Sequence, residues 1–324
     1  MPYLPAMELV RGGLDRLAAA AGSAREAAAG TARELAGAGR YALRTFGTPA
    51  GARAALIEGV WLAARVTLYP VGLVREQVRH TPGYRTDVLS PAQRGLVVTD
   101  VAAAGTPILL VHGILDNRSV FTVFRRALRR RGFGVVHAVN YGLFTDDVRT
   151  AAHELRGHVE RLRELTGADR VHIVGHSLGG VIARYYVQRL GGHRTVDTLV
   201  TLGSPHRGTS TAYLLPTRLA RQLRPGSDVV AELAEPARGC TTRFLAVWSR
   251  MDQLVVPQRN ARLTHPDLHV EQLELHDVGH LSLPIDPRTV HWVATALARP
   301  HAVAGTRRAR PAGPAAFHEE SSPA

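Results

Sequence analysis

Short runs of apolar, β-branched residues alternate with amphipathic segments over the last two-thirds of this 324-residue chain. Apolar runs bounded by turn residues predict buried strands, and apolar positions spaced by three or four residues predict helices. Their alternation predicts an α/β fold: a mostly parallel sheet with helices on both faces. The predicted strands are Leu96–Val98, Pro107–Val111, Gly134–Val139, Val171–Val174, Val196–Thr201, Thr242–Ser249 and His269–Leu275, and the predicted helices are Val120–Arg131, Val148–Leu165, Val181–Val187 and Pro287–Leu297.

The last predicted strand differs from the others because its polar and apolar residues alternate along His269–Leu275. Such alternation is typical of a half-exposed strand, so we expect this strand near the edge of the sheet. The interval of residues 209–235 is longer than an ordinary connection between elements, which marks it as an insertion.

Residues 1–94 are expected to form an N-terminal helical extension without a catalytic motif. Its most apolar segment, Ala54–Tyr69, is interrupted by Glu58 and Arg65 and should end at Pro70. Three interpretations stay open: a helix packed on the catalytic domain, a helix at a membrane surface through residues 54–74, or a membrane span. The first residues lack the basic start and apolar core of a secretory signal, so we expect a cytoplasmic or membrane-associated protein. The tail of residues 300–324, rich in Pro, Ala and Arg, is expected to be disordered.

The most informative motif is Gly175-His176-Ser177-Leu178-Gly179-Gly180. It lies between a predicted buried strand and a predicted helix, the context in which Gly-x-Ser-x-Gly presents a nucleophilic serine. Only Gly fits two places before and after the serine in so sharp a turn. The pattern indicates that Ser177 Oγ is exposed at the N-terminus of a helix, where negative charge is stabilised.

A serine nucleophile needs a base and an acid, and in this fold they follow it in the order acid, then His. Asp252 stands just past the strand Thr242–Ser249, and His280 lies in the loop after the last strand. Asp252 is therefore the candidate acid and His280 the candidate base. His276, nearer to the strand in the same loop, is interpreted as structural.

Together with the dipeptide His112-Gly113 and the stretch Leu202–Gly208, this motif resembles the α/β-hydrolase superfamily and, within it, bacterial lipases and esterases. The resemblance covers about residues 95–299, which would form the catalytic domain. It implies that the backbone N–H groups of Ile114 and Leu178 form the oxyanion hole, and that His112 shapes the backbone beside it. It also supports Asp252 and His280 as the remaining triad members. The chain departs from the family pattern at Arg207, which could alter the rim of the site.

The resemblance also places a lid or cap at about residues 209–238. Leu215, Leu219 and Leu223 recur every four positions, which predicts one apolar helical face. That face either covers the sheet for stability or lines an acyl-chain groove and moves at a lipid surface.

Composition argues against disulfides, metal sites and nucleic-acid binding. Cys240 is the only cysteine, so no intrachain disulfide can form, and the histidines show no metal-ligand spacing. The net charge is +13 and every basic residue is Arg, but the arginines are scattered and no aromatic residues interleave with them. We therefore expect no nucleic-acid partner, no metal and no cofactor.

The expected function is a serine hydrolase that cleaves small-molecule or lipid carboxylic esters through an acyl-enzyme. An acyltransferase using the same triad and a catalytically silent binding protein remain alternatives, because one fold hosts several functions. The acyl chain, the alcohol and the oligomeric state are left open by the sequence.

Overall fold

The computed structural model describes residues 47–73, 105–114, 116–140 and 146–299, together with scattered helical positions between residues 22 and 40. The predicted strand Leu96–Val98, the tail of residues 300–324 and most of the extension before residue 47 lie outside the described residues.

Six described strands form one sheet in the order β2-β1-β3-β4-β5-β6, and every neighbouring pair is parallel. The expected parallel sheet is confirmed, and β6 lies at its edge as its alternating pattern predicted. The strand bounds are β1 Ile108–Val111, β2 Val136–Val139, β3 Val171–His176, β4 Val196–Leu202, β5 Arg243–Ser249 and β6 His269–Leu275.

Continuous apolar strands form here because both faces of the sheet are covered. Leu109 and Val111 of β1 belong to one buried cluster, whereas Ile108 and Leu110 belong to the other. Successive side chains of a strand point to opposite faces, so a fully apolar strand packs against both helical layers.

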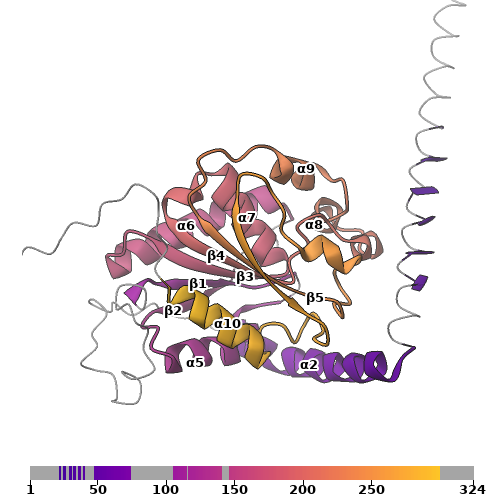
Figure 1. Cartoon of the computed structure of the whole chain (residues 1–324), viewed down its shortest axis with the longest axis horizontal. Helices are drawn as coiled ribbons and strands as arrows, with labels where there is room; N and C mark the ends of the chain where they lie inside the picture. The colour runs from indigo at the N-terminus through magenta and orange to yellow at the C-terminus, as the bar shows by residue number, and fades with distance from the viewer. Residues whose placement is uncertain are drawn as a thin grey trace, which may run out of the picture.

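Helices cover both faces of the sheet, as predicted (Figure 1). One layer holds α6, α7, α8 and α9, whose apolar residues join the first cluster, and the opposite layer holds α5 and α10. Asp147 caps the N-terminus of α6, and Asp286 caps that of α10. The bounds are α5 Thr122–Arg130, α6 Val148–Thr166, α7 Leu178–Arg189, α8 Arg218–Gln222, α9 Asp228–Ala234 and α10 Pro287–Leu297, with 3-10 turns at Arg118–Phe121, Gly192–Arg194, Ser210–Leu214 and Gln258–Ala261.

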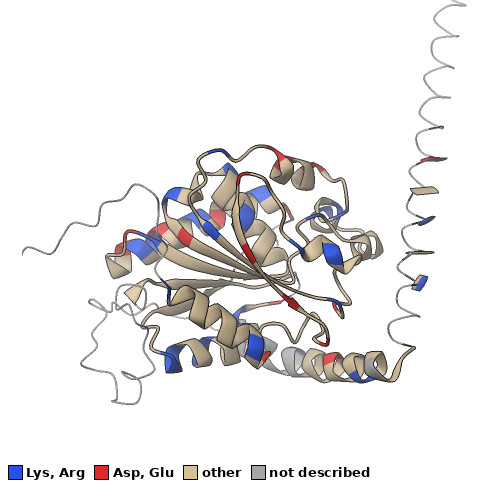
Figure 2. Cartoon of the chain, viewed as in Figure 1, with Lys and Arg blue, Asp and Glu red and all other residues tan. Residues whose placement is uncertain are grey.

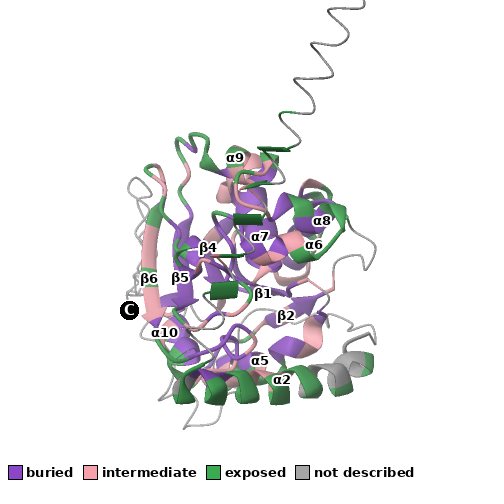
Figure 3. Ribbon diagram, turned by 90° about the vertical axis from the view of Figure 1, so that its right-hand side faces the viewer, coloured by how far each residue is buried: buried purple, intermediate pink, exposed green. Residues whose placement is uncertain are grey.

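The N-terminal helix α2, Pro49–Leu73, lies along the layer that contains α5 (Figures 1 and 3). It is longer than expected, because it continues three residues past Pro70 instead of ending there. Proline lacks a backbone N–H, so Pro70 interrupts the hydrogen-bond ladder of α2, and only three further residues are helical. No helix within the described residues is both long and apolar enough to cross a membrane.

The chain runs from β1 outward to β2 and then returns to β3 on the other side of β1. The connections after β1 and β3 therefore leave the sheet in opposite directions at this point. In open parallel sheets ligands bind at the carboxyl ends of the strands beside such a switch point. Ile114 follows β1 and Ser177 follows β3, so both lie beside it.

Candidate active site

Ser177 forms the turn between β3 and α7 and has φ 55° and ψ −123°, the one positive φ of a non-glycine residue among the described residues. A side chain in this region stores strain, which persists only where the surroundings hold it. The surroundings are tight: a Cβ on Gly175 would meet the backbone of Gly180, and one on Gly179 would meet the carbonyl oxygens of Val111 and His112. Close backbone packing therefore explains the glycines of the motif.

Asp252 and His280 form a buried pair: Asp252 Oδ2 lies 2.7 Å from His280 Nδ1, and the two residues are 0% and 1% exposed. The other carboxylate oxygen, Oδ1, accepts hydrogen bonds from the N–H groups of Leu254 at 2.9 Å and Val255 at 2.7 Å. Both oxygens of the Asp252 carboxylate thus have hydrogen-bond partners. The carboxylate fixes the imidazole so that its Nε2 is the nitrogen left for other chemistry.

Two further residues, Gln253 and His176, hold His280 in place. Its backbone N–H donates to Gln253 Oε1 at 3.0 Å, and its carbonyl oxygen accepts from His176 Nε2 at 3.1 Å. The rings of His176 and His280 pack with centroids 4.8 Å apart. Because His176 directly precedes Ser177, these contacts tie the loop of the histidine to the turn of the serine.

The residues of the two predicted oxyanion donors, Leu178 and Ile114, come from the elements that follow β3 and β1. Leu178 opens α7, where the first backbone N–H groups have no partner inside the helix. Ile114 lines the same cavity as Ser177, and a Cβ on the preceding Gly113 would come within 3.0 Å of Ser177 Cβ. The turn after β1 can approach the serine this closely only because position 113 has no side chain.

A cavity of about 560 Å³ opens beside Ser177. Its polar lining is confined to Ser177, Asp116, Gln253 and two threonines, and the rest is apolar. A mostly apolar cavity with few polar groups suits the hydrocarbon part of a ligand. The apolar lining residues are Leu62, Ile114, Pro205, Ala212, Leu214, Leu215, Ala220, Leu223, Leu254, Val255 and Leu281.

The insertion after β4 does not form the single amphipathic helix that the sequence suggested. It consists of the 3-10 turn Ser210–Leu214, the short helix α8 and the short helix α9. Leu215 lies outside any helix, whereas Leu219 is 8% exposed and packs in the core. Of the three leucines of the predicted apolar face, Leu215 and Leu223 line the cavity of Ser177, whereas Leu219 packs in the core and Leu214 joins the lining.

Glu58 of α2 contacts the loop that carries His280. Its carboxylate accepts hydrogen bonds from the backbone N–H of Leu281 at 2.6 Å, from that of Ser282 at 3.0 Å and from the Ser282 hydroxyl. Leu62, one turn further along α2, lines the cavity of Ser177. The sequence indicated Glu58 only as an interruption of an apolar segment, and no local pattern could have paired it with residues 281 and 282. These contacts favour a helix packed on the domain.

The sequence also singles out two further histidines, His276 and His112. The His276 side chain is 65% exposed, within 4.0 Å of Glu274. His112 is 3% exposed and donates through Nδ1 to the carbonyl oxygen of Gly113 at 2.9 Å. Burial lowers the pKa of His112 to about 4, so its ring is neutral at pH 7.

No group of three or more potential metal ligands gathers within the part of the chain that the structure describes. Basic and acidic side chains are interspersed over the described domain (Figure 2).

Comparisons with known proteins agree on one fold. The family described as palmitoyl protein thioesterase matches residues 107–244, less than half of the chain. A triacylglycerol lipase of Burkholderia plantarii is 31% identical over 134 residues, which cover 39% of this chain and 36% of that protein. A lysosomal thioesterase of Xenopus laevis, PPT2-B, is 26% identical over 117 residues, 35% of this chain and 40% of that protein. The chain thus matches well under half the length of these relatives.

Two solved structures share the fold at low sequence identity. Lipase B of Aspergillus fumigatus has a TM-score of 0.55 and 15% identity, covering 70% of this chain and 62% of that one. The mature lipase BlEst2 of Bacillus licheniformis has a TM-score of 0.52 and 17% identity, covering 62% and 95% respectively.

Proposed function

Since the chain belongs to the α/β-hydrolase superfamily, among its lipases and esterases, we propose that it is a serine hydrolase that cleaves esters of apolar acyl groups. The fold alone hosts many reactions, so the proposal rests on the site. The observation that supports it is the buried Asp252–His280 pair, held at 2.7 Å, together with a serine of strained backbone that lines an apolar cavity.

In the proposed acylation step, Ser177 Oγ attacks the acyl carbonyl carbon while His280 Nε2 takes the hydroxyl proton. Asp252 holds the Nδ1–H side of the ring and stabilises the imidazolium as it forms. The carbonyl oxygen becomes an oxyanion, which the N–H groups of Leu178 and Ile114 would stabilise. The dipole of α7 favours the same charge, because its N-terminus begins at Leu178.

The tetrahedral intermediate then collapses. The imidazolium of His280 returns its proton to the leaving alcohol, and an acyl-enzyme on Ser177 remains. In the second half, His280 takes a proton from water, the hydroxide attacks the acyl carbon, and the acid leaves as Ser177 regains its proton. An acyltransferase would differ only in that an alcohol replaces this water.

The cavity supports an apolar acyl chain as the recognised part of the substrate. Leu214, Leu215 and Leu223 surround a space of about 560 Å³ beside Ser177, and few polar groups line it. Burial of each methylene stabilises binding by roughly 0.8 kcal/mol, so a longer chain should gain affinity until the cavity is full.

A thioester is the second candidate substrate, because the matching family is described as a palmitoyl protein thioesterase. Both reactions form the same acyl-enzyme and differ in the leaving group. A panel of p-nitrophenyl esters and matched acyl thioesters, from acetyl to palmitoyl, separates them by kcat/KM. Added alcohol acceptors, with both products quantified, separate hydrolysis from acyl transfer. The proposal fails if no member of the panel is turned over.

A further inference from the structure

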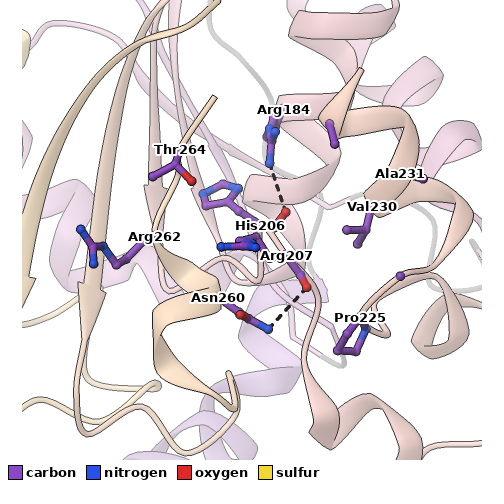
Figure 4. A pocket seen from close by; sticks show the side chains of 11 residues that line it. Arg184, His206, Arg207, Pro225, Val230, Ala231, Asn260, Arg262 and Thr264 are labelled. Carbon is purple, nitrogen blue, oxygen red and sulfur yellow. Dashed lines mark hydrogen bonds between the residues drawn. The ribbon is translucent and has the colours of Figure 1, made fainter. Parts of the chain in front are cut away.

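A second cavity, of about 590 Å³, is lined partly by residues of the loop that follows β4 (Figure 4). Pro205 of this loop lines the cavity of Ser177, whereas His206 and Arg207 line the second one. Its cationic and polar lining is contributed by Arg184, His206, Arg207, Asn260, Arg262 and Thr264, and its apolar wall by Pro225, Val230, Ala231 and Ala234. The lining includes no acidic residue.

Arg184 is the central observation because its cationic side chain is 3% exposed. Its guanidinium donates to three neutral acceptors: Gln188 Oε1 at 2.5 Å, the His206 carbonyl oxygen at 3.2 Å and the Leu233 carbonyl oxygen at 2.7 Å. A guanidinium has five N–H donors, so two remain for another partner. A buried charge without a counter-ion is costly, which makes its position beside an open cavity informative.

Arg184 differs from two other arginines of limited exposure, which have acidic partners. Arg149 pairs with Asp228 at 2.8 Å and with Glu232, and Arg243 pairs with Glu271 at 2.7 Å. By contrast, none of Arg184, Arg207 and Arg262 forms an ion pair with a carboxylate in the described part of the chain. Three arginines without a carboxylate partner thus border one cavity, and one of them, Arg262, lies over the Trp248 ring at 5.6 Å from its centroid.

His206 adds a buried donor to the same place. Its Nε2 lies 3.0 Å from Thr201 Oγ1, and its Nδ1 is buried without a hydrogen-bond partner among the described residues. Burial, with the nearby Arg184, lowers the pKa of this imidazole well below its usual value, so the ring is neutral. When Nε2 accepts from the Thr201 hydroxyl, Nδ1 carries the proton and can donate to a ligand.

We propose that this cavity is a binding site for a phosphate group, with Arg184 at its base and Arg207 and Arg262 at its exposed rim. A phosphate has enough oxygen atoms to accept from several guanidinium forks at once, and its double charge would neutralise most of the local positive charge. The cavity exceeds the size of a single ion, and Pro225, Val230 and Ala231 form an apolar wall opposite the arginines (Figure 4). The ligand class is therefore a small organic phosphate monoester.

Calorimetric titration of the full chain tests this site with inorganic phosphate, glycerol 3-phosphate and uncharged glycerol at near-physiological salt. Saturable binding of glycerol 3-phosphate, with none of glycerol, is the expected result. The rim variant Arg207→Gln/Arg262→Gln should weaken it by at least about tenfold, because two charge-assisted contacts are lost. The matched control is Arg156→Gln/Arg161→Gln, which removes the same charge from two exposed positions of α6 and should bind like the parent.

Vesicles distinguish a soluble ligand from a lipid headgroup. Binding to phosphatidic acid in phosphatidylcholine that depends on the rim arginines, without binding of soluble phosphates, would identify the phosphate as a headgroup. The proposal is overturned if neither the soluble phosphates nor the vesicles bind, or if both double variants lose binding equally. Equal loss would mean that overall positive charge, not this cavity, attracts the anion.

Discussion

Glu58 and Ser282 are 224 residues apart in the sequence and are joined by two hydrogen bonds, from the backbone N–H and the hydroxyl of Ser282 to one carboxylate. Ser282 follows the candidate base His280 by two residues, and the N–H of the intervening Leu281 binds the same carboxylate. The N-terminal helix thus holds the loop on which the proposed chemistry depends.

Glu58→Ala should lower kcat for ester hydrolysis by about tenfold or more, with little change in KM, because the loop loses three hydrogen bonds that position His280. Glu58→Gln should retain much of the activity, since its amide oxygen still accepts hydrogen bonds. Leu56→Ala, at a 70% exposed position of the same helix, is the control and should behave like the parent. Loss of stability with unchanged kcat in Glu58→Ala would assign this residue a purely structural role.

The same substitution should affect different properties at two leucines of the insertion. Leu214 is 69% exposed and lines the cavity, so Leu214→Asp should depress hydrolysis of long-chain esters far more than of p-nitrophenyl acetate, at an unchanged melting temperature. Leu219 is packed in the core, so Leu219→Asp buries a charge and should lower the melting temperature by several degrees or more. Chain-length profiles and thermal melts of both variants provide the check. An equal effect of the two substitutions on stability would contradict the different burial of the two side chains.

Substitutions at the candidate acid and base should separate the roles of the two histidines in the loop after β6. Asp252→Asn should reduce kcat by on the order of 10⁴ by misorienting the imidazole, and His280→Ala should reduce it further, by up to about 10⁶. His276→Ala should cost little, because its side chain is 65% exposed and its ion-pair distance to Glu274 is 4.0 Å. A large loss of kcat in His276→Ala, with His280→Ala active, would reverse the assignment.

Stability should fall as the pH is lowered from about 6.5 toward 4, in part because of His112. Burial lowers the pKa of this histidine from 6.5 to about 4 in the folded protein, so the unfolded chain binds the proton first as the pH falls. Above pH 6.5 the His112 imidazole is neutral in both states, so it adds no pH dependence to the stability. Urea unfolding at pH 7 and pH 5 measures this contribution to the free energy of unfolding. Between pH 7 and pH 5, the free energy of unfolding of His112→Asn, whose amide still donates, should fall by about 2 kcal/mol less than that of the parent. An identical loss in both proteins would show that His112 does not titrate this way.

Local patterns predicted most of the fold and little of what surrounds the site. Strands such as Ile108–Val111 were predictable because a sheet covered on both faces requires continuous apolar runs. The proximity of Asp252 and His280 was also expected, because both follow neighbouring parallel strands and the carboxyl ends of these strands meet at one edge. The break in the insertion had a local signal that was missed: Pro216 disfavours helix at Leu215, and Thr217 caps α8.

Two other features had no local signal. The contact of Glu58 with Ser282 depends on how the N-terminal helix packs on a distant loop. The sequence of α7 indicated that it packs against the sheet, but not that Arg184 is buried beside a cavity formed partly by residues 206–207 and 260–264. Such contacts depend on tertiary packing, which the spacing of residues along one element does not encode.

Covalent labelling of Ser177 tests the central claim most directly. The parent chain is incubated with a fluorophosphonate, digested and analysed by mass spectrometry, beside Ser177→Ala and Ser204→Ala, a nearby buried serine of the loop after β4. We predict one adduct, on Ser177, formed at the rate at which ester hydrolysis is lost, absent from Ser177→Ala and retained in Ser204→Ala. Hydrolysis by Ser177→Ala within about tenfold of the parent, or an adduct on another residue, would contradict the assignment of Ser177 as the nucleophile.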